Sequence, residues 1–338
     1  MEFIKKATRI DFLGKRYICF AMSGTLIMIG IVSMIIQGLN FGIDFTGGTV
    51  VEVAYDQPVE IAKARDLLRK GNINDAQVQY YGSSSELLVR LPGTAQGKKS
   101  DELSNDVMQA LRKPYDEVVV PGTEQSDTQQ CVTPGGSRSP CRVQMRRVEF
   151  VGPQVGQQLT QQGGLAMMYA LIMILVYVAW RFEWRLSVGA VAALVHDVLI
   201  TIGVFSVFQL DFSLNVLAAV LAVIGYSLND TIVVFDRIRE NFRRMRKGST
   251  IEIMNAALNQ TLSRTTLTSG TVLLVLIALL TLGGDAIWGF ALALVIGVVV
   301  GTYSSIYVAS AIALHLGVSK EDLAVPVKEG AEQKRSQP

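Results

Sequence analysis

The sequence is poor in charged residues. Asp, Glu, Lys and Arg make up only 18% of its 338 residues, whereas soluble domains usually carry about 25%. Half of the residues are hydrophobic. This balance excludes a wholly water-soluble globule, a secreted enzyme and a disordered scaffold.

Several functional signatures are also missing. The sequence contains no P-loop, no kinase signature and no glycine-rich nucleotide-binding loop, so we expect neither an ATP-driven step nor an enzyme active site. It has two histidines and three cysteines, and we expect no metal site and no cofactor. The net charge of +2 gives no sign of nucleic-acid binding, and we expect no such partner.

Long hydrophobic runs account for the low charge. Each has close to the roughly 20 residues that a membrane-spanning helix needs, which also excludes the short alternating strands of a membrane β-barrel. The first run resembles a signal peptide but lacks a following small-residue cleavage site, so we expect an uncleaved anchor. The predicted spans are 17–39, 164–180, 186–208, 212–235, 265–282 and 288–314.

Basic residues gather on one side of these spans. The loops 209–211 and 283–287 contain no Lys or Arg. The positive-inside rule therefore predicts a multi-pass protein of the bacterial inner membrane with both termini in the cytoplasm. The cytoplasmic parts would be 1–16, the basic segment 236–264 and the tail 315–338, with 40–163 in the periplasm.

The basic segment 236–264 has two interpretations. Ile238, Phe242 and Met245 recur at helical spacing among its arginines. This pattern is typical of a helix that lies on an anionic membrane surface. A solvated helical loop is the other interpretation.

The periplasmic segment 40–163 shows the periodicity of a small α+β domain. Its strands and helices follow one another in the order of a ferredoxin-like domain. The expected elements are strand 48–56, helix 58–71, hairpin strands 76–82 and 86–91, helix 101–113 and strands 117–120 and 142–151.

Residues 121–141 depart from this pattern as an excursion rich in Pro, Gly, Ser and Gln. Cys131 and Cys141 lie at its C-terminal end, where an oxidising compartment would permit a disulfide. A disulfide that closes this loop and a pair of free thiols both remain open. Metal binding is the weaker alternative, because no His and no further Cys is near.

Polar residues inside the predicted spans are candidate functional residues, because an ionisable group at the bilayer centre costs about 2.5–3.5 kcal/mol. Asp230 is the strongest candidate. Burial favours its neutral acid and a nearby cation favours its carboxylate, so it could bind and release a proton. Arg264 is the expected cation. The further candidates are Asn229, His196, Asp197 and Thr268, the last in a polar stripe that could hold a short water chain.

Structural interpretations of the same residues stay open. Asp230 and Arg264 could be an ion pair that only fixes helix register, and Arg264 could be an interfacial positive residue. His196 could be a packing histidine bonded to a neighbouring helix. Adjacent residues point about 100° apart on a helix, so His196 and Asp197 are not expected to face one partner. Asp197 is expected to be buried against a polar group.

Five motifs in order resemble the SecF family of protein-export membrane subunits, within the resistance-nodulation-division superfamily. The resemblance extends from about residue 10 to 315. The excursion 121–141 is outside the pattern. The motifs are FGIDFTGGT (41–49), VEFVGPQVG (148–156), LVHDVLITIG (194–203), IGYSLNDTIVVFDRIRENFR (224–243) and NQTLSRTTLTSGT (259–271).

The resemblance implies a function and partners. Such a subunit pairs with SecD and associates with the SecYEG channel, and the pair uses the proton-motive force to draw unfolded polypeptide outward after SecA has pushed it. YajC and membrane lipids are further expected partners. By motif match, Asp230 and Arg264 correspond to the family's proton-pathway residues, with protons, or alternatively sodium ions, as the coupling ion.

Two other functions compete with this one. The chain could be half of a proton-coupled exporter of small solutes or lipids, although about 124 outer residues are few for a substrate tunnel. It could also be a passive assembly factor, in which Asp230 and Arg264 would only hold helices in register.

Overall fold

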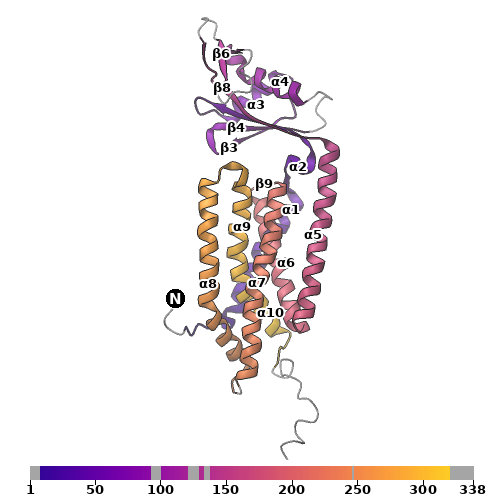
Figure 1. Ribbon diagram of the computed structural model, residues 1–338, viewed down its shortest axis with the longest axis vertical. Helices are drawn as coiled ribbons and strands as arrows, with labels where there is room; N and C mark the ends of the chain where they lie inside the picture. Colours follow the sequence, from indigo (N-terminus) through magenta and orange to yellow (C-terminus); the bar gives the residue numbers. More distant parts are fainter. Residues whose placement is uncertain (1–7, 93–99, 121–128, 133–137, 246, 320–338) are drawn as a thin grey trace, which may run out of the picture.

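A computed structural model describes residues 8–92, 100–120, 129–132, 138–245 and 247–319. Six helices long and apolar enough to cross a membrane stand side by side below an α+β domain (Figure 1). The predicted six-span helical fold with an α+β domain between the first two spans is confirmed. The spans are α1 (Arg16–Ile36), α5 (Pro153–Arg181), α6 (Trp184–Val207), α7 (Leu214–Arg244), α8 (Thr250–Leu282) and α9 (Asp285–Ser304), the last continued by a π-helical turn, η3 (Ser305–Ala309), and α10 (Ser310–His315).

The spans differ in how deeply they are buried in the bundle. At least half of the apolar window of α6, α7 and the last span is buried inside the protein, against 17% for α1 and α8 and 6% for α5. Three helices therefore form the centre of the bundle, and α5 stands almost free along its length. Only the inner helices can shield an ionisable group from lipid on all sides.

The structure corrects the interpretation of the basic segment 236–264. This segment is neither a surface helix nor a solvated loop, because α7 continues to Arg244 and α8 already begins at Thr250. Ile238 and Phe242 are buried in the same apolar cluster as Ile253 of α8. The apolar stripe therefore packs one helix extension against the other.

Several other spans also begin or end away from the predicted positions. Helix α5 begins at Pro153, well before 164, and α1 ends at Ile36 before 39. Residue Ser249 caps α8 in a capping box with Glu252, and Gly248, at a φ of 115°, allows the turn that precedes it. Polar first turns hid these helix starts from a search for apolar runs.

The α+β domain has the predicted ferredoxin-like order. Its four strands form an antiparallel sheet in the order β3-β4-β2-β8, and both helices pack their apolar stripes on one face of it. The other face is turned toward the bundle (Figure 1). The elements are β2 (Gly48–Tyr55), α3 (Ile61–Lys70), β3 (Gln77–Tyr81), β4 (Ser83–Pro92), α4 (Ser100–Arg112) and β8 (Val143–Val151).

An insertion between α4 and β8 forms a separate small sheet. The predicted strand 117–120 belongs to this sheet and not to the main one, as β5 (Val118–Val119) beside β6 (Gln130–Val132) and β7 (Arg138–Pro140). A disulfide joins Cys131 of β6 to Cys141, the residue after β7. Residues 121–128 and 133–137 of the predicted excursion lie outside the described residues.

Candidate functional site

Asp197 of α6 is a fully buried carboxylate with every oxygen bonded. Its Oδ2 accepts hydrogen bonds from Ser227 of α7 (2.5 Å) and from Ser304 at the end of α9 (2.8 Å). Its Oδ1 lies 2.8 Å from Nδ1 of His196. The carboxylate therefore joins three inner helices at one point.

His196 extends this cluster to the first helix. Its Nε2 lies 3.0 Å from the hydroxyl of Ser23 on α1, which lies 3.2 Å from the hydroxyl of Tyr303. Tyr303 in turn donates to the carbonyl of Cys19, 3.0 Å away. His196 thus contacts a neighbouring helix, as one interpretation held. His196 and Asp197 have different partners on other helices, as expected, but they also bond to each other.

Asp230 of α7 is also buried but is bonded less completely. It is 4% exposed, and its Oδ2 has no hydrogen-bond partner among the described residues. The hydroxyl of Thr265, on the facing turn of α8, is likewise buried without a partner. The Thr265 hydroxyl, as a donor that faces Asp230 beyond normal hydrogen-bond distance, and the charge of Arg264 are the α8 groups that favour the carboxylate of Asp230. This site therefore holds one buried carboxyl group beside one buried hydroxyl, and Asp230 Oδ2 and Thr265 Oγ1 can each still form a hydrogen bond.

The two carboxyl sites lie along one stretch of α7. Ser227, which donates to Asp197, stands three residues before Asp230 and so on the same helix face. On the adjoining side, Tyr226 donates to Ser269 of α8 (3.0 Å), and Ser269 bonds Thr302 of α9 (2.7 Å). Polar side chains therefore form two separate hydrogen-bonded groups at this level of the bundle, one around Asp197 and one between α7, α8 and α9.

The other predicted site residues lie outside these groups. Arg264 is exposed and makes no ion pair with Asp230 within 4.0 Å, so the buried ion pair considered from the sequence is absent between these two described residues. Asn229 is exposed. Thr268 is also exposed and donates to backbone carbonyls of its own helix at 3.0 Å. In the predicted polar stripe, the hydroxyl of Thr268 therefore bonds to its own helix backbone.

Sequence reasoning missed the hydroxyl groups that complete the buried network. Ser23, Ser227 and Ser304 are each fully or almost fully buried. A serine in an apolar span is the signal that could have identified them. That signal is weak, because serine also serves as a small packing residue in membrane helices.

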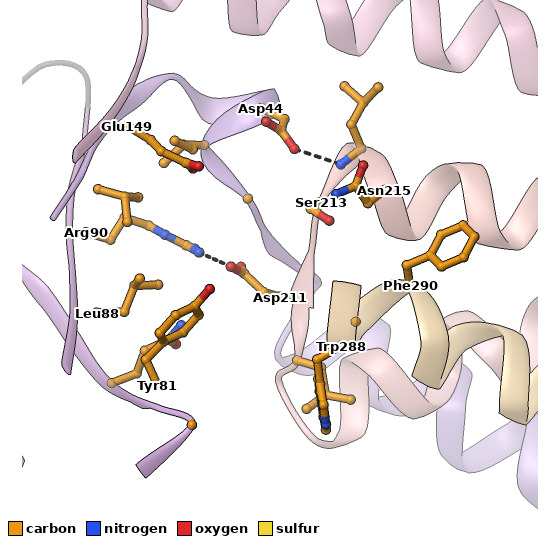
Figure 2. Close-up of a pocket in the computed structure, with 18 of the residues that line it drawn as sticks. Asp44, Tyr81, Leu88, Arg90, Glu149, Asp211, Ser213, Asn215, Trp288 and Phe290 are labelled. Atoms are coloured by element: carbon orange, nitrogen blue, oxygen red, sulfur yellow. Dashed lines mark hydrogen bonds and ion pairs between the residues drawn. The ribbon is translucent and has the colours of Figure 1, made fainter. Parts of the chain in front are cut away.

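The region where the helix bundle meets the α+β domain is a further polar site (Figure 2). A cavity of about 700 Å³ lies between the sheet and the N-terminal ends of α7 and α9. Arg90 of β4 crosses it to form an ion pair with Asp211, and Asp44 accepts a hydrogen bond from the backbone of Leu214 (2.8 Å). Tyr81 and Trp288 line another side of the cavity.

Glu183 marks the opposite end of the bundle, in the turn between α5 and α6. Burial raises the pKa of this carboxyl group, and the guanidinium groups of Arg239 and Arg243 partly oppose the shift. Arg239 lies 3.7 Å from it. Among the residues that the structure describes, no three His, Cys, Asp or Glu side chains gather as metal ligands would.

Comparisons with known proteins agree with one another. The family model for the protein export membrane protein SecD/SecF, C-terminal, matches residues 137–319, and that for the SecD/SecF GG motif matches 32–59. The chain is 48% identical to the protein translocase subunit SecF of Vibrio alginolyticus, over 98% of both chains. It is 45% identical to that of Escherichia coli O157:H7, over 96% of this chain and 93% of the relative.

A solved structure shows the same likeness. The chain resembles SecDF of Thermus thermophilus, a translocon-associated membrane protein, with a TM-score of 0.77 and 34% identity. The similarity covers 94% of this chain and 39% of that one. A super-membrane-facing form of SecDF matches with a TM-score of 0.62.

Proposed function

This chain belongs to the SecD/SecF family of protein export membrane proteins, and from that premise we propose that it works with a SecD-type partner to drive protein export with the proton-motive force. The partner would supply the part of SecDF that this chain lacks, since the chain spans 39% of that protein. The exported polypeptide would pass through the SecYEG channel. SecA and YajC would act in the same pathway.

The observation that carries the proposal is the state of Asp230. Its buried oxygen has no partner among the described residues, so a proton can bind there without breaking a hydrogen bond. Binding would remove a charge from the interior of the bundle, where charge is costly. Arg264 is charged at every working pH and acts on Asp230. Its role would be to favour the carboxylate until the proton arrives.

The available energy suits such a step. One elementary charge that crosses the membrane potential supplies about 2.3 kcal/mol per 100 mV. A few protons in each cycle would thus supply several kcal/mol, enough to shift an equilibrium between two arrangements of packed helices. The α+β domain would then move on the side of the membrane that ATP does not reach.

The proposal includes an orientation. Both termini and the long ends of α7 and α8 would lie in the cytoplasm, where Arg237, Arg243 and Arg244 obey the positive-inside rule. The α+β domain would lie in the periplasm. We propose no cofactor, and protons as the coupling ion, with sodium as the alternative that the experiment below distinguishes.

The test replaces Asp230 by Asn in the chain assembled with its partner in membrane vesicles. We expect the Asp230→Asn variant to assemble normally and to lose the part of precursor export that the proton-motive force stimulates. The matched control is Asn229→Ala, at the exposed neighbouring position, which should keep that stimulation. Undiminished stimulation in the Asp230→Asn variant would refute the proposal.

Proton flux into liposomes that contain the pair separates the competing functions. A passive assembly factor would carry none, and an exporter of small solutes would carry flux without any effect on precursor export. If the flux follows an imposed sodium gradient instead of a proton gradient, sodium is the coupling ion.

A further inference from the structure

The outer end of α7 is joined to the chain that enters the α+β domain. Strand β1 (Asn40–Phe41), which follows α1, pairs in parallel with β9 (Asp211–Phe212), which precedes α7. The amide of Gly42 adds a hydrogen bond to the carbonyl of Phe212 at 3.0 Å. The start of α7 is therefore bonded to the segment 40–46 that leads into the α+β domain, which we call the stalk. More than 160 residues separate the two in the sequence.

A carboxylate of the stalk also caps α7. Asp44 lies in the short helix α2 (Ile43–Thr46), directly before the first strand of the domain. Its Oδ2 accepts a hydrogen bond from the backbone amide of Leu214, the first residue of α7, at 2.8 Å. A negative charge at a helix N-terminus stabilises the helix through its unbonded amides and its dipole.

Arg90 connects the sheet itself to the same place. It extends from β4, an inner strand of the sheet, and its guanidinium forms an ion pair with Asp211 of β9. The same group donates to the side chain of Asn40 (3.3 Å) and to the carbonyl of Phe41 (3.2 Å). Its side chain is only 11% exposed. Figure 2 shows it bridging the cavity from the sheet to the bundle.

The cavity contains a matched pair that makes no such bridge. Arg147 and Glu149 pair with each other within β8 and stay inside the domain. Arg147 is 57% exposed. This pair is also an arginine with a carboxylate, like Arg90 with Asp211, but it connects the domain neither to β9 nor to α7.

We propose that Arg90 and Asp44 are positioning residues that couple the α+β domain to α7, so that a shift of the helix carrying Asp230 moves the domain. Helix α7 runs unbroken from Leu214 to Arg244 and can transmit a displacement along its length. The covalent links to α1 and α5 would then act as hinges. This inference rests on the proposed function for its second readout only.

The test measures the position of the domain directly. Spin labels at Lys63 of α3 and at Leu282, the outer end of α8, report the distance between domain and bundle in the complete chain with its partner, in nanodiscs, with Cys19→Ala as background. We expect a narrow distance distribution in the parent and a broad one in Arg90→Gln. The charge swap Arg90→Asp with Asp211→Arg should narrow it again, and Asp44→Asn should broaden it less than Arg90→Gln.

Export in vesicles is the second readout. Arg90→Gln should lose the stimulation by the proton-motive force, the charge swap should regain it, and Arg147→Gln should change neither readout. A distribution as narrow in Arg90→Gln as in the parent overturns the proposal. So does a broad distribution with full stimulation. If the parent itself shows no stimulation, the proposed function fails, and the distance distributions still decide whether Arg90 holds the domain.

Discussion

Asp197 and Asp230 are two buried carboxyl groups in one bundle, and they differ in the groups that surround them. Asp197 is bonded by Ser227, Ser304 and His196, whereas one oxygen of Asp230 has no partner within the described residues. Protonation of Asp197 would disturb bonds that join helices. Protonation of Asp230 at Oδ2 would break no hydrogen bond among the described residues, although it would remove the charge that the Thr265 hydroxyl and Arg264 stabilise. Burial alone therefore does not distinguish the two carboxyl groups, and the bonding of their oxygens does.

The largest expected effect is the loss of Asp197. Asp197→Ala leaves two serine hydroxyls and a histidine buried without their acceptor, and we expect the free energy of unfolding to fall by about 3–5 kcal/mol. Thermal unfolding of the purified protein in detergent measures it. Asp230→Ala is the control and should change stability by less than about 1 kcal/mol. A larger loss in that control would remove the distinction between the two sites.

A smaller loss of stability is expected at Ser227, which lies between the Asp197 and Asp230 sites. Ser227→Ala removes one of the two hydroxyl donors to Asp197 Oδ2 while Ser304 remains, so we expect a loss of about 1–2 kcal/mol. The double variant with Asp197→Ala should lose less than the sum of the single losses, because the two changes remove the same bond. Additive losses in the melting experiment would show that Ser227 contributes elsewhere.

The smallest effect is expected at Glu183, outside the spans. Burial raises the pKa of Glu183 in the folded protein above the ordinary value of 4.5. Between these two pKa values, the folded state therefore keeps a proton that the unfolded state has released. Stability should therefore fall slightly as pH rises from 4.5 through the folded pKa. Glu183→Gln should flatten this slope in melting curves recorded across acidic pH. An unchanged slope would assign the pH dependence to another group.

The sequence predicted the architecture well because periodicity reports burial. Apolar runs located the six spans, alternation located the central strand at 48–56, and the hairpin pattern located its neighbour at 86–91. The same evidence failed at 236–264, where the apolar residues that contact a neighbouring helix also fit a membrane surface. Charge marked Asp230 and Asp197 as unusual, but the distinction between them depends on serines contributed by other helices.

Arg264 shows the limit of pairing residues by type. As the cation nearest in sequence to the fifth span, it was the natural partner of Asp230, yet Thr265 next to it is the residue that faces the bundle interior. A one-residue step on a helix changes the direction of a side chain by about 100°. Helix rotation is set by packing, which a single sequence does not report.

The wide turn η3 also has a consequence for the last span. A π-helical turn holds one more residue than an α-helical one, so the segment after it is rotated by about 100° relative to an uninterrupted helix. Ser310, whose hydroxyl bonds the carbonyl of Ser305 at 3.0 Å, lies just beyond this offset. A helical wheel drawn straight through 285–315 would therefore assign the wrong side of α10 to the interior. Deletion of one residue between 305 and 309 would turn Ala313 away from Gly189 of α6.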